Sequence, residues 1–425
     1  MLTERLEHYF DRLFPICRSI TGNGLRQSFH ILQEVIPLEL HEVPTGTACF
    51  DWTVPREWNI EDAYILRPDG KKICDFQQNN LHVVNYSIPQ EKELTYEELL
   101  PRLHTIPDMP TAIPYVTSYY RENWGFCLTH EELQTLPKEG TYKVVIKSSL
   151  AEGSLTYGDL VLKGETDQEV LISTYLCHPS MANNELSGPL VAAFLYEKIK
   201  ALPRRKYTYR FIFAPETIGV IAYLSKNGSY MKEKTVAGYV LTCCGDAGDF
   251  VYKKSKRGNS LADRAAMHLL QYQEVPFHII PFAIGGSDER QYCSPGFNMP
   301  VGSLTRSIYQ RYKEYHTSLD NKDFISFDAM EHTIEVYFQM LKAIELNEIY
   351  VNKIPYCEPQ LGKRGLYPDM GAISFRQGIE FTHNLLHFLT YTDGEHDLID
   401  LADKRNRSVL AFEEVIARCK NANLI

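Results

Sequence analysis

The stretch EVLISTYLCHPSMANNELSGPLVAAFLYEKIKAL, residues 169–202, decides the fold that we predict for this chain. It opens with an apolar run of strand length, passes through a polar loop, and ends in a segment whose apolar residues recur at helical spacing. Ser187 and Pro189 stand where the helix would begin, and both residue types are favoured there. A buried strand that leads through a polar loop into a helix is typical of an α/β domain.

The same alternation continues along the chain. Further strand-like runs are KVVIKSSL, KYTYRFIFA, AGYVLTCC and PVGSLT, and further helix-like segments are NSLADRAAMHLLQYQ and FDAMEHTIEVYFQMLKAIEL. Strands that alternate with helices favour a largely parallel sheet. We therefore predict an α/β core that comprises residues 1–45 and 141–350.

Two other regions differ from this core. Residues 46–140 are rich in proline, aromatic residues and short β-like runs, and they predict a small, inserted β-rich domain. Residues 351–425 begin with a stretch that contains glycine and proline and continue with three helix-like segments, a succession that resembles a winged helix. Three domains are consistent with a length of 425 residues, which exceeds what one hydrophobic core normally serves.

The charge balance argues against broad attraction to nucleic acid or to anionic membranes. The chain has 44 Lys and Arg against 54 Asp and Glu, a formal net charge of -10. Residues 352–425 contain nine basic and ten acidic side chains, a net of -1, although Lys404, Arg405 and Arg407 cluster. A DNA reader normally presents a clear basic face, so we expect the C-terminal module to bind a protein partner or to self-associate.

The N-terminus and the cysteines bear on the cellular compartment. No apolar signal-peptide core follows the charged N-terminal segment, and no apolar run has the length that spans a bilayer. The ten cysteines are scattered without a CxxC pair. We therefore predict reduced thiols, a cytoplasmic location and no membrane association.

Polar side chains follow several of the predicted strands. His178 follows LISTYL, Glu216 follows RFIFAP, Asp246 follows YVLTCCG, and His316 lies in YKEYHTSLDN. In open α/β sheets, ligands bind at the carboxyl ends of the strands. Imidazole and carboxylate ligands suit zinc, and a carboxylate beside an activated water suits general-base hydrolysis.

Each of these residues also has a structural interpretation. A lone histidine after a strand is more often hydrogen-bonded than metal-bound, and this applies to both His178 and His316. Glu216 could cap the helix that follows it. Asp246 could hold a glycine turn, with Asp249 competing for any ligand role. The chemistry therefore depends on the set of residues rather than on one of them.

The order of the segments supports the set. CHPS, ANNELSG, PETIG, LTCCGD, GGSDERQYCSPGFNMP and YHTSLD follow the order of the site segments in zinc-dependent aminopeptidases of the two-metal type, which this chain resembles. Through SITGNG, DWTVPREW and IPYVTSYYRENWGFC the whole chain also resembles a bacterial family of aminopeptidase-like proteins of unknown function. That family has a β-rich insertion and a C-terminal winged helix and is often associated with polysaccharide-biosynthesis loci. The resemblance implies a metal-dependent hydrolase that acts on a peptide or another small amide.

The chain departs from the two-metal pattern at three positions. Asn184 stands where the bridging aspartate would be, Thr217 replaces the second glutamate, and Thr242 or a shifted Asp246 replaces the third aspartate. Neutral oxygens compensate two close cations less than carboxylates do. We therefore predict one zinc ion. The predicted ligands are His178, Glu185, Asp246 and His316, the general base is Glu216, and the substrate-binding residues are Asn184, Asp288, Arg306, Tyr312 and Tyr315.

The lost carboxylates also support an alternative. In this alternative, the chain is a catalytically inactive aminopeptidase-fold scaffold or regulator that is linked to polysaccharide biosynthesis, and its C-terminal module binds a partner or DNA.

Overall fold

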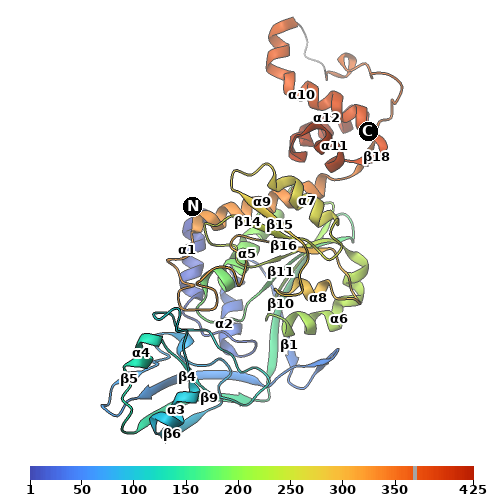
Figure 1. The fold of residues 1–425 in the computed structure, drawn as a ribbon. Helices are drawn as coiled ribbons and strands as arrows, with labels where there is room; N and C mark the ends of the chain where they lie inside the picture. Colours follow the sequence, from blue (N-terminus) through green and yellow to red (C-terminus); the bar gives the residue numbers. More distant parts are fainter. Residues whose placement is uncertain (367–370) are drawn as a thin grey trace. The chain divides into compact units, whose positions relative to one another are not determined.

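The computed structural model describes residues 1–366 and 371–425, and for residues 371–379 it describes the backbone only. The described residues form two compact units (Figure 1). The first unit comprises Met1–Gly258 and Phe277–Glu335, and the second comprises Asn259–Pro276 and Val336–Ile425. Within the described residues, no helix combines the length and the apolar character that crossing a membrane requires.

An eight-stranded sheet is the centre of the first unit. The strand order is β1-β10-β12-β11-β13-β16-β14-β15. The strands are β1 (Glu39–Pro44), β10 (Ser154–Leu162), β12 (Thr208–Ala214), β11 (Glu169–Tyr175), β13 (Thr235–Leu241), β16 (Val301–Thr305), β14 (Phe250–Lys253) and β15 (Phe277–Ile280). The four central strands from β12 to β16 run parallel to one another. The predicted α/β class with a mostly parallel sheet is confirmed.

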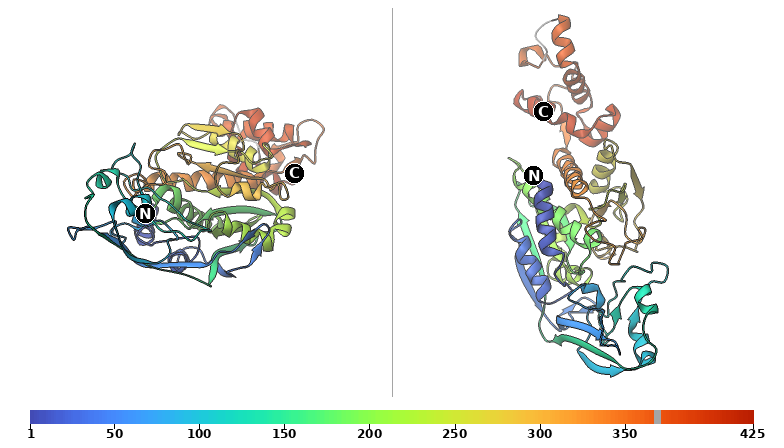
Figure 2. Two further views of the ribbon diagram at one scale, coloured as in Figure 1. Left: turned by 60° about the horizontal axis from the view of Figure 1, so that its bottom comes forward. Right: turned by 90° about the vertical axis from the view of Figure 1, so that its left-hand side faces the viewer.

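Burial explains why the central strands are mainly apolar. Every residue of β11 and of β12 is buried, as expected for parallel strands that are covered on both faces. Helix α5 (Ser187–Lys200) packs on β11 and β13, while α6 (Ile218–Lys234) packs on β10. Figure 2 shows α1 (Leu2–Leu13) and α2 (Asn23–Leu32), both blue, lying side by side along this unit.

The close approach of α5 to β13 requires a glycine. A methyl group on Gly188 would clash with the backbone oxygen of Leu241 and with the hydroxyl of Thr174. We expect Gly188→Ala to lower the free energy of unfolding by about 1–3 kcal/mol, because a well-packed site cannot absorb the added group. Chemical denaturation would measure the change. Gly296→Ala is the matched control, since a methyl group there meets open space, and an equal effect of the two changes would contradict the prediction.

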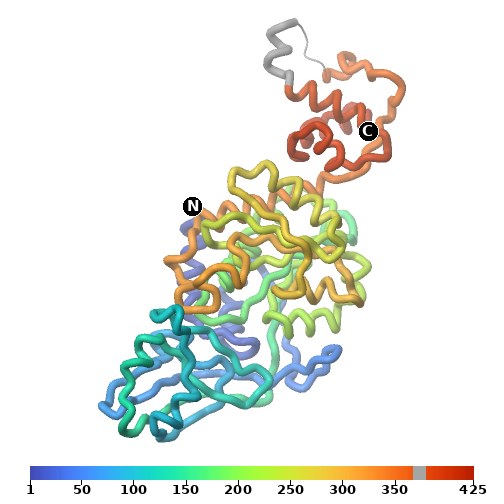
Figure 3. The backbone as a smooth tube through the Cα atoms, in the orientation of Figure 1, coloured from blue at the N-terminus to red at the C-terminus, as the bar shows by residue number. Residues whose placement is uncertain are grey.

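The first unit also contains a second, smaller sheet, which includes strands from the β-rich region. Its order is β5-β4-β9-β6. These strands are β5 (Lys72–Ile73), β4 (Glu57–Leu66), β9 (Tyr142–Ala151) and β6 (Gln90–Leu94). Strand β9 pairs with β4 and β6 and not with the large sheet, because Val144 and Ile146 pack in the core of the small sheet. Figure 3 follows the backbone from this sheet into β10. The domain boundaries at residues 46 and 140 remain predictions.

The second unit contains the C-terminal residues. Its elements are α7 (Leu261–Leu270), the end of α9 (Phe327–Leu346), β17 (Ile349–Val351), α10 (Gly371–Tyr391), β18 (Asp393–Asp397), α11 (Leu398–Arg405) and α12 (Glu413–Asn421). Strands β17 and β18 pair in antiparallel orientation, although α10 lies between them in the sequence. Arg264 of α7 donates to Asp397 at 2.7 Å, and the backbone N–H of Val409 donates to His268 at 2.8 Å. These contacts explain why α7, which we assigned to the α/β core, clusters with the C-terminal residues.

Candidate active site

The candidate site lies at the carboxyl ends of the central strands. His178 follows β11 and Glu216 follows β12, and these strands are parallel neighbours. Both side chains line a cavity of about 410 Å³ together with His316 and Arg290. The position at the ends of parallel strands is the one at which α/β proteins bind their ligands.

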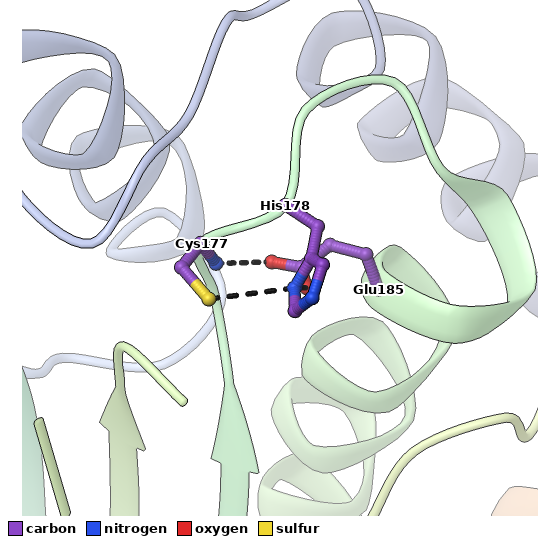
Figure 4. A group of neighbouring side chains, drawn as sticks. All are labelled: Cys177, His178 and Glu185. Atoms are coloured by element: carbon purple, nitrogen blue, oxygen red, sulfur yellow. Dashed lines mark hydrogen bonds and ion pairs between the residues drawn. The ribbon is translucent and has the colours of Figure 1, made fainter. Parts of the chain in front are cut away.

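A buried carboxylate accepts a hydrogen bond from His178 on the side of the ring that faces away from the cavity. Nδ1 of His178 donates to Oε2 of Glu185 at 2.8 Å, and Glu185 also accepts the backbone N–H of Cys177 (Figure 4). Glu185 is fully buried. A carboxylate in this place fixes the tautomer and the orientation of the ring. Nε2 is therefore the nitrogen that faces the cavity, 3.7 Å from Oε2 of Glu216.

A buried arginine compensates the charge of Glu185. Arg18 has no exposed surface, its Nε lies 3.9 Å from Oε1 of Glu185, and it donates to the backbone oxygen of His178 at 3.1 Å. Burial lowers the pKa of His178, but Cys177 and Glu185 raise it further, so that the pKa lies well above its usual value. Burial also raises the pKa of the Cys177 thiol to about 11, so the thiol stays protonated at neutral pH.

A strained turn presents Glu216 to the cavity. Thr217 has φ +65° and ψ -78°, and the N–H of Ile218 donates to the oxygen of Glu216 at 2.8 Å, which defines a γ-turn that costs energy for a residue with a side chain. The Thr217 N–H donates to Asp288 at 2.8 Å, and Arg290 donates to the Thr217 hydroxyl at 2.9 Å. Burial raises the pKa of Glu216, against the opposing effect of His178 and Arg290. A raised pKa suits a general base that works near neutral pH.

The β-rich region holds His316 at the other side of the cavity. Tyr115 donates its backbone N–H to the oxygen of His316 at 2.8 Å, and His316 has a left-handed φ of +56°. Nε2 of His316 lies 3.2 Å from Oδ1 of Asn184, and the rings of His316 and His178 are 5.3 Å apart between centroids. Burial, followed by the neighbouring His178, lowers the pKa of His316 to about 3. His316 is therefore neutral, which is the form that binds metals, whereas His178, whose pKa is raised, would have to release its extra proton when an ion binds.

Other predicted site residues lie outside the cavity. Asp246 accepts hydrogen bonds from Gly248, Ser307 and Asn183, each at 2.7 Å. Arg306 is buried and donates to the Thr333 hydroxyl at 2.9 Å. Neither side chain lines the cavity.

The predicted tyrosines are placed differently from each other. The hydroxyl of Tyr312 lies 3.4 Å from Asp320, and Tyr315 stacks on His316 with 3.9 Å between ring centroids. Tyr315 thus supports the His316 ring, while the hydroxyl of Tyr312 is engaged by Asp320.

The four predicted metal ligands do not form one group in the structure. Within the described part of the chain, the groups of three or more ligand atoms that lie within 4.8 Å of one another are Cys177 with His178 and Glu185, and Glu39 with His41 and Asp159. Arg18 stands beside the first group. A fixed positive charge and a protonated thiol favour a hydrogen-bonded network there over a cation.

Comparison with known proteins identifies the family. The family described as "Domain of unknown function (DUF4910)" matches residues 7–347, and the description "winged helix-turn-helix" matches residues 348–425. The chain belongs to the DUF4910 family. The predicted recognition of an aminopeptidase-like family with a C-terminal winged helix is thereby confirmed.

Relatives of this DUF4910 member carry names that refer to peptidases. It is 48% identical to a Clostridium acetobutylicum protein named "Putative polysaccharide biosynthesis protein with aminopeptidase-like domain", over 93% of this chain and 89% of that protein. A solved structure described as a "putative peptidase" from the same organism is 44% identical, with a TM-score of 0.92 over 99% of this chain and 96% of that chain. BSAP, a zinc aminopeptidase from Bacillus subtilis, shares the fold at 12% identity, with a TM-score of 0.54 over 79% and 94% of the two chains.

The donor set of this DUF4910 site lacks the carboxylates that two close cations would need. The Thr217 hydroxyl accepts from Arg290, and the Thr242 hydroxyl donates to the backbone oxygen of Asn184 at 2.9 Å. Neither position offers a carboxylate, and the guanidinium places a positive charge where a second cation would need a negative one. The imidazoles of His178 and His316 line the cavity, and Oδ1 of Asn184 lies 3.2 Å from Nε2 of His316.

Sequence reasoning missed several residues of the cavity wall. Arg290 and the side chains of Trp52, Tyr115, Tyr119 and Tyr120 line the cavity. The aromatic residues come from the β-rich region, and most of them lie in or next to the segment IPYVTSYYRENWGFC that carried the family resemblance. Their concentration in one polar-aromatic segment was the available signal.

Asp288 makes the stability of the site dependent on pH. Burial, followed by the charge of Glu216, raises the pKa of Asp288 from its usual 3.8 to about 8. Because the folded state binds this proton more tightly than the unfolded state, the contribution of Asp288 to stability is lost as pH rises from about 4 to about 8. We expect thermal unfolding midpoints to fall across this window, and less steeply in Asp288→Asn. Asp108→Asn, at an exposed aspartate, should keep the wild-type slope, and an unchanged slope in Asp288→Asn would contradict the assignment.

Proposed function

We propose that the chain is a hydrolase of the aminopeptidase-like class that cleaves a peptide or another small amide with the help of one zinc ion. The observation that carries the proposal is the convergence of Nε2 of His178, the His316 ring and the Glu216 carboxylate on one cavity. His178 and His316 would hold the ion, and Oδ1 of Asn184 lies beside His316 at 3.2 Å. When bound, zinc supplies Lewis-acid chemistry that polarises a carbonyl group and acidifies water.

The chain's own residues would carry the proton transfer. Glu216 takes the proton of the attacking water and delivers it to the leaving nitrogen, so that a carbon–oxygen bond forms while the carbon–nitrogen bond breaks. Glu185 keeps Nδ1 of His178 protonated and its Nε2 directed at the cavity.

Zinc titration of the purified protein tests the proposed centre. We expect one zinc per chain, loss of binding in His178→Ala and His316→Ala, and unchanged binding in the control Asp249→Asn. Glu185→Gln should weaken zinc binding about 10- to 100-fold, because it removes the carboxylate that orients His178. Elemental analysis and calorimetry give the readout.

Three results of the same experiment would reject the proposed centre. They are no stoichiometric zinc, zinc binding that survives both histidine changes, or two zinc ions per chain. The variant Asp246→Asn tests whether Asp246 is also a zinc ligand, as predicted from the sequence. Its binding should match the wild type, because the Asp246 oxygens already accept hydrogen bonds from Gly248, Ser307 and Asn183.

A second candidate is the inactive scaffold or regulator. The neutral side chains of Asn184, Thr217 and Thr242 favour it, as does the winged-helix match at residues 348–425. In this function the C-terminal module binds a protein partner, itself or DNA. Tight binding to random duplex DNA that falls steeply with salt would favour DNA over a protein partner. Amide hydrolysis that requires Glu216 would reject the inactive scaffold.

The cysteines support a cytoplasmic location. All ten are free thiols, and eight of them are buried. A chain without disulfides suits a reducing compartment.

A further inference from the structure

The guanidinium of Arg290 is an unpaired positive charge on the cavity wall. Arg290 lines the cavity and donates to the Thr217 hydroxyl at 2.9 Å. Its Nε is buried and has no hydrogen-bond partner, and the guanidinium forms no ion pair with any residue that the structure describes. Arginine offers five donors in a planar fork that matches a carboxylate or a phosphate. A buried donor without a partner is costly unless a ligand satisfies it.

The charges around Arg290 leave room for an anion. The acidic groups nearest to it are Glu216, which also lines the cavity, and Asp288, which lies behind Thr217. Glu216 lies 3.7 Å from Nε2 of His178, and Oδ1 of Asp288 accepts the Thr217 N–H, so neither carboxyl group is ion-paired with Arg290. His178 is already paired with Glu185, at 2.8 Å between Nδ1 and Oε2. The guanidinium is thus the charged group of the wall that lacks a counter-charge in contact with it.

The remaining wall is aromatic. Trp52 and Tyr120 lie edge to face at 5.6 Å and are 39% and 51% exposed, so they form an accessible rim. Deeper in the cavity, the hydroxyls of Tyr115 and Tyr119 hydrogen-bond to each other at 2.9 Å. Such rings offer flat apolar faces with polar tips. A ligand with a compact apolar or ring-shaped body fits between this wall and Arg290.

We propose that the cavity selects amides that carry an oxyanion, a carboxylate or a phosphate, and that Arg290 is the residue that binds this group. The inference names the substrate class of the proposed hydrolase and therefore rests on that function. The oxyanion accepts hydrogen bonds from the Arg290 fork, the body of the ligand contacts Tyr115 and Tyr119, and the amide lies toward Glu216 and the two histidines.

Binding of matched probes tests the proposal without requiring turnover. The probes are N-acetyl-L-phenylalanine, its C-terminal amide, and phenyl phosphate, and calorimetry measures their binding to the full-length Glu216→Gln protein. We expect at least one of the two anions to bind about 10-fold tighter than the neutral amide. Whether the carboxylate or the phosphate binds tighter identifies the source of the oxyanion. Arg290→Gln should abolish the preference, and Arg290→Lys should retain only part of it, because lysine keeps the charge but not the fork.

The control is Arg257→Gln, which removes an exposed guanidinium that donates to the backbone oxygen of Asn298. It should leave the preference unchanged. Thermal unfolding of each variant verifies that the fold is intact. Equal binding of the acid, the amide and the phosphate, a preference that survives Arg290→Gln, or no binding of any probe at millimolar concentration would overturn the inference. A clear anion preference in a protein that hydrolyses no amide would instead reject the hydrolase and leave the Arg290 site standing.

Discussion

Arg18→Met is expected to lower the free energy of unfolding by about 3–5 kcal/mol, because it leaves the Glu185 carboxylate buried without its cation. Both side chains have no exposed surface, and the Arg18 guanidinium also donates to the backbone oxygen of Leu13 at 2.6 Å. The change therefore removes charge compensation and hydrogen bonds at once. Chemical denaturation at neutral pH would measure it.

The chain offers a matched control for this change. Arg12 pairs with Glu34 at 2.6 Å, but both side chains are substantially exposed to water. Arg12→Met should cost no more than about 1 kcal/mol, because water screens an exposed pair. The double variant Arg18→Met with Glu185→Leu should recover much of the loss, because it removes both buried charges. A cost for Arg18→Met as small as that of Arg12→Met would show that Glu185 does not depend on Arg18.

Glu216→Gln is expected to lower kcat on an amide substrate by about 10²- to 10⁴-fold, which is the usual effect of removing a general base. Glutamine has the shape of glutamate but cannot take the proton of water. KM and zinc content should change little, because His178 and His316 are the proposed ligands. Steady-state kinetics on a panel of aminoacyl and peptide amides, with elemental analysis of the same samples, would test both statements.

The control for Glu216→Gln is again Asp249→Asn, which should keep wild-type turnover. Activity that persists unchanged in Glu216→Gln would point to a contaminating peptidase or to another base. A loss of zinc together with activity would instead mean that Glu216 is a zinc ligand. Oε2 of Glu216 lies 3.7 Å from Nε2 of His178, which would bind the same ion.

The α/β core could be predicted because its signals are local. The largely apolar run of β11 and the helical spacing of α5 both lie within residues 169–202, and every residue of β11 is buried. Strand β9 and helix α7 were recognised as strand and helix, yet their partners were not. Pairing with β4 or with Asp397 depends on residues far along the chain, and local periodicity does not report it.

In the candidate site, too, some features could be predicted from the local sequence and others depend on the tertiary fold. His178, Glu216 and Asp246 all follow strands, but only the first two line the cavity. After β13 the chain turns at Cys243, which has a left-handed φ of +49°, and the oxygens of Asp246 are then engaged by Gly248, Ser307 and Asn183. The position after a central strand can bring a side chain near the site, and the direction of the following turn decides whether it lines the cavity.

By itself the sequence determined the class of fold, the order of its segments and the presence of histidine and glutamate after the central strands, because periodicity and residue type are properties of neighbouring positions. Only the tertiary structure decided that Glu185 lies behind His178, that the β-rich region supports His316 through Tyr115, and that Arg290 faces the cavity. Those roles depend on distances of a few ångströms between residues that are far apart along the chain. Folding sets these distances, and no single segment contains them.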